Sequence, residues 1–230
     1  MKPGDHLGEA AQKVARPLLL GHRGARKYAP ENTMSAFQLA LQHGCDGFEF
    51  DVRYTRDKRG IVCHDPWHRN RELCKCEFSD LGLPAAVDVI RSFAGRAYLD
   101  VELKELGLEE ALWEALKQVP VGDFLVSSFV PAILENVHEQ LPQFRLGLIC
   151  ETERELAEWR ELPFLAAIML HYQLASDASV KSFNDDGLEV FVWTVNRKEE
   201  MLRFAQMGVR GLISDDTKLL AETFKDWHMV

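Results

Sequence analysis

The stretch LLLGHRGARKYAPENTMSAFQLALQHGCDGFEFD, residues 18–51, contains a complete strand–helix–strand unit. Its first segment, Leu18–His22, is a short apolar run, as expected for a strand buried on both faces of a parallel sheet. The next segment, Asn32–His43, places apolar residues at i, i+1, i+4 and i+5, which is one face of a helix. A second apolar run, Gly47–Asp51, follows. The stretch therefore predicts two parallel strands joined by a helix.

The same alternation continues to the end of the chain. Further apolar runs of about five residues, the usual length of a strand, are Ala97–Glu102, Phe124–Ser128, Arg145–Ile149, Ala166–Leu170, Glu189–Thr194 and Gly211–Ser214. Helical patterns between and after them are Ala85–Phe93, Glu109–Gln118, Pro131–Gln140, Glu153–Glu161, Ser176–Asp185, Lys198–Gln206 and Thr217–Phe224. Eight strands, each followed by a helix, predict an α/β fold of the (β/α)8 TIM-barrel type. An open doubly wound sheet is the alternative, but eight strands without an interior break favour a closed barrel.

One segment breaks the alternation. After Gly47–Asp51 the chain reads VRYT, then the polar stretch RDKRG, then IVCHD. The polar stretch is too short for a parallel crossover, which needs about a dozen residues or more. We therefore predict a β-hairpin over residues 52–65, followed by a short insertion. A hairpin returns to its start, so it brings His64 back beside Asp51.

The composition fits one domain over residues 1–230, with a polar N-terminal extension at 1–16. Lys and Arg number 27 against 36 Asp and Glu, and the net charge of −9 argues against a nucleic-acid-binding face. No apolar run approaches the roughly 18 residues of a membrane span, and the N-terminus lacks the apolar core of a signal peptide. Homo-oligomerisation is left open.

The cysteines indicate a reducing compartment. There are five, an odd number in a domain of ordinary size, which fits free thiols in the cytoplasm. Cys74 and Cys76 are closer together than the usual zinc ligand pair, and no second pair lies nearby. Their role is left open.

Acidic residues collect at the carboxyl ends of the predicted strands, where a barrel places its active site. Glu49 and Asp51 are two apart on one strand, so both side chains point to the same face. Glu102 ends the next strand of the barrel. Three carboxylates at one rim cannot all stay ionised without a countercharge. Oxygen ligands select a hard cation, so we predict one divalent ion, Mg²⁺ or Ca²⁺.

Basic residues lie at the same predicted rim. Arg23 and Lys104, together with a cation, would make a site for phosphate oxygens. His22 and His64 flank that site and titrate near neutral pH, so they can act as acid and base. Hydrolysis of a phosphodiester needs both, a base for the nucleophile and an acid for the leaving oxygen. Each of these residues alone could have an ordinary structural role. Because all of them collect on one rim, a catalytic role is favoured.

Two aromatic residues also fall at strand ends. Phe129 follows the fourth strand of the barrel and Trp193 lies near the end of the seventh. Both are candidate substrate-binding residues at the mouth of the site. Packing at the top of the barrel is an equal alternative.

The order of these motifs matches a known family. They are His22-Arg23-Gly24, Pro30-Glu31-Asn32-Thr33, Glu49-Phe50-Asp51-Val52, His64-Asp65, Glu102-Leu103-Lys104, Ser127-Ser128-Phe129, Trp193-Thr194-Val195-Asn196 and Ser214-Asp215. Over roughly residues 18–222 the chain resembles the glycerophosphodiester phosphodiesterase family. The resemblance implies a TIM barrel with a small insertion. It also implies hydrolysis of a glycerophosphodiester, such as glycerophosphocholine or glycerophosphoethanolamine, to glycerol 3-phosphate and an alcohol.

The resemblance assigns roles to the residues at the rim. It implies Glu49, Asp51 and Glu102 as metal ligands, His22 and His64 as the general acid–base pair, and Arg23 and Lys104 as phosphate ligands. It does not decide between Mg²⁺ and Ca²⁺, nor which histidine starts as the base. Direct attack by water and a cyclic phosphate intermediate both remain open.

The chain departs from the family pattern in one region. Only about 36 residues separate Asp65 from Glu102, fewer than in many bacterial members, whose longer insertion covers the glycerol moiety. The identity of the substrate is therefore left open. One alternative is phospholipase D-like cleavage of a lysophospholipid on the same barrel. A second is binding of a phosphorylated ligand without turnover, which the complete set of histidines and acids disfavours.

Overall fold

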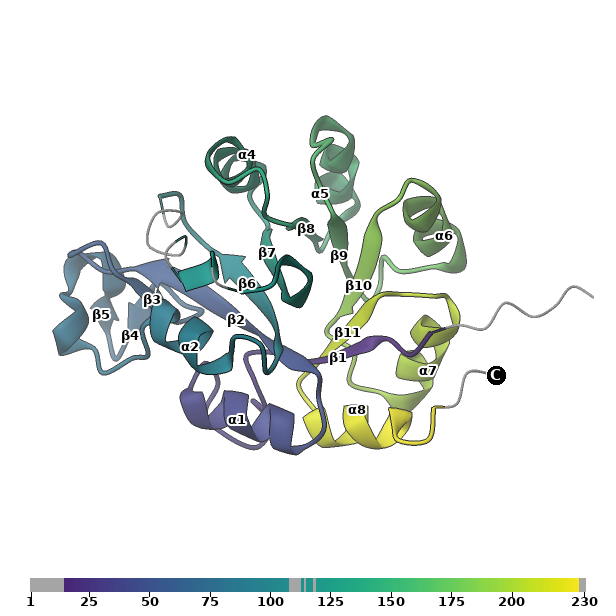
Figure 1. Cartoon of the computed structure of the whole chain (residues 1–230), viewed down its shortest axis with the longest axis horizontal. Coiled ribbons are helices and arrows are strands. Elements are labelled where there is room, and N and C mark those ends of the chain that lie inside the picture. The colour runs from purple at the N-terminus through teal and green to yellow at the C-terminus, as the bar shows by residue number, and fades with distance from the viewer. Residues whose placement is uncertain (1–14, 108–112, 114, 118, 228–230) are drawn as a thin grey trace, which may run out of the picture.

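Eight parallel strands form a closed barrel in the computed structural model, which describes residues 15–227 apart from 108–112, 114 and 118 (Figure 1). The strands are β1 (Leu18–Gly21), β2 (Gly47–Tyr54), β6 (Tyr98–Leu103), β7 (Phe124–Ser128), β8 (Leu146–Cys150), β9 (Ala167–His171), β10 (Glu189–Trp193) and β11 (Gly211–Ser214). They follow this order around the barrel, and β1 pairs with both β2 and β11. The predicted barrel is confirmed and the open sheet is excluded.

Helices surround the strands on the outside of the barrel (Figure 1). They are α1 (Met34–Gln42), α2 (Ala86–Phe93), α4 (Pro131–Gln140), α5 (Glu153–Ala157), α6 (Asp177–Asp185), α7 (Lys198–Gln206) and α8 (Thr217–Phe224). The helix predicted at Glu109–Gln118 and the extension predicted at 1–16 lie largely outside the described residues. The helix predicted at Glu153–Glu161 is α5 followed by a 3₁₀ helix, η4 (Glu158–Glu161). In the part of the chain that the structure describes, no helix combines the length and apolar composition that crossing a bilayer requires.

The strands are buried on both faces, as their apolar sequences predict. Apolar side chains from alternating positions fill the barrel interior, and a second, larger set packs between strands and helices. Two glycines permit the strands to approach. A Cβ atom at Gly47 would lie 1.9 Å from the carbonyl oxygen of Tyr98, and one at Gly211 would lie 2.4 Å from the ring of Phe191.

The predicted hairpin is present and projects to one side of the barrel, at the left of Figure 1. β3 (Gly60–Val62) runs antiparallel to β2, with Val62 opposite Val52. The first strand of the hairpin is the end of β2, which continues beyond the barrel to Tyr54 and pairs there with β3. This pairing returns the chain to the barrel mouth, where the backbone N–H of Cys63 donates to the carbonyl of Asp51, N to O distance 3.1 Å.

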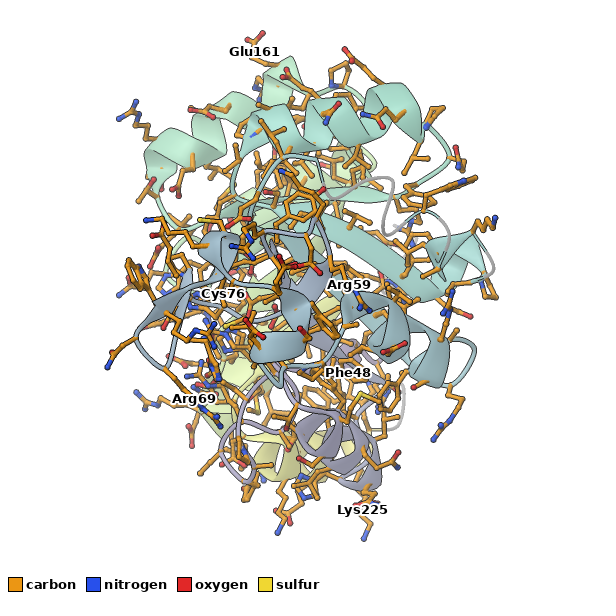
Figure 2. The ribbon with its side chains drawn as sticks, turned by 90° about the vertical axis from the view of Figure 1, so that its left-hand side faces the viewer. Phe48, Arg59, Arg69, Cys76, Glu161 and Lys225 are labelled. Carbon is orange, nitrogen blue, oxygen red and sulfur yellow. The ribbon has the colours of Figure 1, made fainter. Side chains whose placement is uncertain are left out.

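The insertion, residues 65–85, has its own small structure. Its elements are β4 (Trp67–His68), β5 (Arg71–Glu72) and the 3₁₀ helices η1 (Leu73–Lys75) and η2 (Phe78–Asp80). A small apolar cluster of Ile61, Leu73, Cys76 and Leu81 supports it. Figure 2 faces this side of the molecule and labels Arg69 and Cys76. Cys74 is exposed, Cys76 is buried, and both are free thiols.

Candidate active site

A cavity of about 180 Å³ opens at the carboxyl ends of the barrel strands. Every site residue predicted from the sequence lines it except Asp51, which is fully buried at its edge. The lining also includes Asp100 and Glu151, to which the sequence analysis gave no role. The closed barrel thus brings residues from all eight of its strands, or the loops that follow them, and from the hairpin around one space.

The acidic cluster follows from strand register. Glu49 and Asp51 alternate on β2, and Asp51 lies beside Glu102 in the parallel ladder between β2 and β6. One carboxylate oxygen from each of the three residues lies within 4.8 Å of the others, and all three side chains are buried. Carboxylates at such spacing are the donor set of a hard divalent cation.

The three carboxyl groups have different electrostatic environments. Burial raises the pKa of Glu49 well above its usual value, and the nearby carboxylates of Asp51 and Glu102 raise it further. Burial also raises the pKa of Glu102 to about 8. For Asp51, burial acts in the same direction, but Lys104 and Arg23 outweigh it and lower the pKa to about 2.

These environments fit a bound cation. Glu49 Oε1 is buried and accepts no hydrogen bond from any described residue. A buried carboxylate oxygen without a partner is costly unless a proton or a cation satisfies it. The cluster is therefore short of positive charge at the position where the three acids meet, and a divalent cation would supply it.

Arg23 and Lys104 lie beside the acids and face the cavity. The ammonium of Lys104 pairs with Glu102, and its Nζ lies 2.9 Å from Asp51 Oδ1. Arg23 Nε lies 3.3 Å from Asp51 Oδ2, and its backbone N–H donates to Glu49 Oε2 at 2.9 Å. Both cations are fixed in place, so they can meet an anion without further ordering.

Each of the two histidines has a carboxylate at Nδ1. The distance from His22 Nδ1 to Asp215 Oδ1 is 2.7 Å, and the distance from His64 Nδ1 to Asp65 Oδ1 is 2.8 Å. Burial lowers the pKa of His22, and the opposing effect of Asp215 does not cancel it. A neutral His22 therefore places its proton on Nδ1, toward Asp215, and leaves Nε2 free to exchange a proton in the cavity.

Some residues of the site had no role in the sequence analysis. Asp215 follows β11 and is itself held by Asn196, whose Nδ2 donates to Asp215 Oδ2 at 2.8 Å. Asp100 is buried beneath the cavity, where Ser127 Oγ donates to it at 2.6 Å and burial raises its pKa to about 7. Asp100 could have been identified, because it precedes Glu102 by two positions and so shares its face.

Two adjacent residues before the first helix, Asn32 and Thr33, take different roles. Thr33 is the N-cap of α1, because its side chain accepts from the backbone N–H of Ala36. Asn32 instead turns inward, and its Nδ2 donates to Asp51 Oδ2 at 2.7 Å. The loop before α1 therefore supports the acidic cluster as well as starting the helix.

The aromatic pair lies on the far side of the cavity. The rings of Phe129 and Trp193 meet edge to face, with centroids 5.6 Å apart. Trp193 Nε1 donates to the carbonyl of Met169 at 3.0 Å, which fixes the orientation of the indole. Both rings line the cavity and also pack on the top of the barrel, so a role in packing does not exclude a role in substrate binding.

A profile of the glycerophosphoryl diester phosphodiesterase family matches residues 22–76 and 98–219, which together form most of the chain. The chain belongs to this family. It is 29% identical to a glycerophosphodiester phosphodiesterase of Caldanaerobacter subterraneus, over 89% of this chain and 96% of that protein. The unmatched interval, 77–97, covers the end of the insertion and all of α2.

Solved structures of the family share the fold. A glycerophosphodiester phosphodiesterase of Thermotoga maritima has a TM-score of 0.78 at 24% identity, covering 90% of this chain and 98% of that one. An Oleispira antarctica phosphodiesterase, in complex with the product sn-glycerol-3-phosphate, has a TM-score of 0.81 at 23% identity, covering 92% and 98%.

Proposed function

We propose that this chain hydrolyses glycerophosphodiesters to glycerol 3-phosphate and an alcohol, with one divalent cation and two histidines. The observation that carries the proposal is that one cavity holds both an acidic cluster and two histidines. Three buried carboxylates adjoin two imidazoles whose Nδ1 atoms are each paired with a further carboxylate. Membership of the family supports the substrate class.

Glu49, Asp51 and Glu102 would hold the cation. Their oxygen donors suit Mg²⁺ or Ca²⁺. When bound, such a cation withdraws charge from the non-bridging oxygens of the phosphate and makes the phosphorus more electrophilic. Mg²⁺ demands a stricter octahedral geometry than Ca²⁺, so metal add-back separates the two.

The residues of the chain supply binding and proton transfer. Arg23 and Lys104 bind phosphate oxygens and stabilise the charge that builds there in the transition state. One imidazole removes the proton from the attacking hydroxyl, and the other gives a proton to the departing alkoxide oxygen. Asp215 and Asp65 hold the Nδ1 protons, so that the Nε2 atoms of His22 and His64 are the atoms that exchange protons.

The attacking hydroxyl belongs either to water or to the glycerol of the substrate. In the second case a cyclic phosphate forms first and is then opened by water. Direct attack by water needs one such pair of proton transfers, whereas the cyclic route needs two pairs, one to close the ring and release the alcohol and one to open the ring with water. Following the products by phosphorus NMR during a single turnover distinguishes them, because only the second route passes through a cyclic phosphate.

The test is release of glycerol 3-phosphate from a panel of glycerophosphodiesters. We expect turnover with Mg²⁺ or Ca²⁺, loss of turnover in a chelator, and recovery when the metal is restored. Full activity in the chelator would contradict the proposed role of the acids. Absence of turnover for every diester with both metals would contradict the proposed reaction.

A lysophospholipid is a second candidate substrate, and exposed apolar residues at the same rim favour it. Leu106 and Val130 follow β6 and β7 at their carboxyl ends and are 54% and 43% exposed. Such side chains could contact an acyl chain. Release of choline from lysophosphatidylcholine, compared with glycerol 3-phosphate from glycerophosphocholine, separates the two candidates.

A further inference from the structure

Opposite walls of the cavity carry different groups, and both cationic side chains of its lining lie on one wall. His22 and Arg23 follow β1, and the acidic cluster and Lys104 belong to the adjacent β2 and β6. In the order of the eight strands, β8 lies across the barrel from β1. Glu151 follows β8 directly and lines the same cavity. A diester whose phosphate rests against Arg23 and Lys104 can therefore extend an arm toward Glu151.

Glu151 has no counterion of its own. Its side chain is exposed, and among the described residues no cation and no side-chain donor pairs with it, although its backbone N–H donates to Glu155. The other acids that line the cavity each accept a hydrogen bond from another residue: Glu49 from Arg23, Glu102 from Lys104 and Asp100 from Ser127. Glu151 also begins an acidic segment, residues 151–161, with five glutamates and two arginines. Glu161, at the top of Figure 2, marks the far end of this segment.

The surface next to Glu151 is aromatic and apolar. Trp193 and Phe129 line the cavity with Ile149 and Met169, and the hydrogen bond from Trp193 to the Met169 carbonyl holds the indole in place. Aromatic faces attract cations, and Trp is the most effective of them. A carboxylate that shares a cavity with aromatic and apolar side chains suits an alkylammonium group, whereas a polyol would require several polar partners.

We propose that Glu151, together with Trp193 and Phe129, forms a binding subsite for a cationic alkylammonium head group. Resting on the proposed function, this inference makes choline- and ethanolamine-type diesters the preferred substrates over diesters of neutral polyols. The anionic phosphate of such a substrate would meet Arg23, Lys104 and the proposed cation, while its cationic head group would meet Glu151 across the cavity. Glu151 acts as a specificity residue and takes no part in the proton transfers.

The test compares glycerophosphocholine with glycerophosphoglycerol, which has a neutral head group. We expect Glu151→Gln to lower the ratio of the two kcat/KM values, choline diester over glycerol diester, by about tenfold, as one ion pair with cation–π support implies. The matched control is Glu153→Gln, which removes the same charge from the same segment at an exposed position outside the cavity. The ratio in this control should equal the wild-type ratio.

Two outcomes would overturn the inference. If Glu151→Gln slows both diesters equally, the carboxylate binds the glycerol that they share. If the ratio falls equally in both variants, the effect is one of general charge and there is no subsite.

A second measurement uses free head groups. Choline should inhibit the wild-type enzyme more strongly than its uncharged analogue 3,3-dimethylbutanol, and Glu151→Gln should abolish this difference. Equal inhibition of the wild type by both compounds would contradict the subsite. Choline binding followed by NMR in the same variants tests the subsite even if the chain hydrolyses neither diester, so failure of the proposed function and failure of this inference are distinguishable.

Discussion

Asp215 shows how His22, a proposed catalytic residue, is held by a residue that is remote in sequence. It is separated from His22 by 193 positions, yet the two side chains approach to 2.7 Å. The contact exists because β11 pairs with β1 and closes the barrel, placing Ser214 beside Gly21. In the proposed mechanism Asp215 is thus a positioning residue, which would act on the substrate only through the imidazole of His22.

Replacing Asp215 with Asn should lower kcat by about 10- to 1,000-fold, because an amide can stabilise the wrong tautomer of His22. Steady-state kinetics with a good phosphodiester measures the loss. The double variant His22→Gln/Asp215→Asn should be no slower than His22→Gln alone, since the aspartate acts through the histidine. Losses that simply add would show that Asp215 acts independently.

His22 and His64 should each be required for turnover. Substituting either with Gln should cost about 10² to 10⁴ in rate, the usual contribution of a proton-transferring side chain. His138 on α4 stacks against Phe164 outside the cavity and provides a matched control. Turnover by either cavity variant at the rate of His138→Gln would contradict the acid–base assignment.

The N-terminal end of α8 stabilises the loop that begins with His22 and Arg23. Asp216 is the N-cap of α8 and accepts from the backbone N–H of Leu219 at 3.1 Å. The same carboxylate accepts from Tyr28 Oη at 2.5 Å and pairs with Lys27. One helix end therefore supports the local structure of the first loop.

The stabilisation by Asp216 should depend on pH. Burial raises its pKa, but hydrogen bonds from Lys27 and Tyr28 outweigh that effect and hold the pKa below 3.8. Because the unfolded chain binds this proton at a higher pH than the folded chain, the stabilisation is complete above about pH 4 and is lost as the pH falls through the folded pKa. Asp216→Asn should cost about 0.5–2 kcal/mol at neutral pH, as loss of an N-cap does.

Urea unfolding at neutral pH and near pH 3 measures this difference. The difference in unfolding free energy between Asp216→Asn and the wild type should narrow at the lower pH, since the unfolded wild-type chain then binds a proton that the folded Asp216 carboxylate resists. Asp177→Asn, at the exposed start of α6, is the control. If the difference in unfolding free energy between Asp216→Asn and the wild type were the same at both pH values, the charge of Asp216 would contribute nothing to stability.

At the scale of the whole molecule, closure of the barrel sets the geometry of the site. The ladder between β2 and β6 aligns Asp51 with Glu102 and also runs past Gly47, which faces the backbone of Tyr98. The spacing of these two strands therefore controls both the stability of the barrel and the distance between two proposed metal ligands.

Gly47→Ala should destabilise the entire fold. Its Cβ would lie 1.9 Å from the Tyr98 carbonyl oxygen, so β2 and β6 would have to separate, at a cost of at least about 1–3 kcal/mol. Chemical denaturation measures the loss. Gly122→Ala is the matched control, because no atom lies within 4 Å of its added Cβ. Equal stability of the two variants would refute this account of closure.

The sequence predicts most of the barrel because local patterns decide it. Apolar runs of strand length, helical periodicity between them and a polar turn too short for a crossover identify the eight strands and the hairpin. The acids of β2 and β6 are also predictable, since their spacing by two within apolar strands implies a shared buried face.

The remaining features depend on relations between distant segments. The pairing of Asp215 with His22 follows from closure, and the position of Glu151 follows from β8 lying opposite β1. Neither relation leaves a periodic signal in the chain. The short elements of the insertion are likewise invisible to periodicity, because strands of two residues and single 3₁₀ turns are shorter than any repeat.

Among the described strands, β3 forms a ladder with β2 alone and takes no part in closing the barrel. The chain between Asp65 and Ala85 can thus differ in sequence without breaking any hydrogen bond of the eight-strand ladder. Every change there nevertheless acts close to His64, the proposed proton carrier, which lies where this segment leaves the hairpin. The three residues from Cys63 to Asp65 therefore connect the insertion to the cavity.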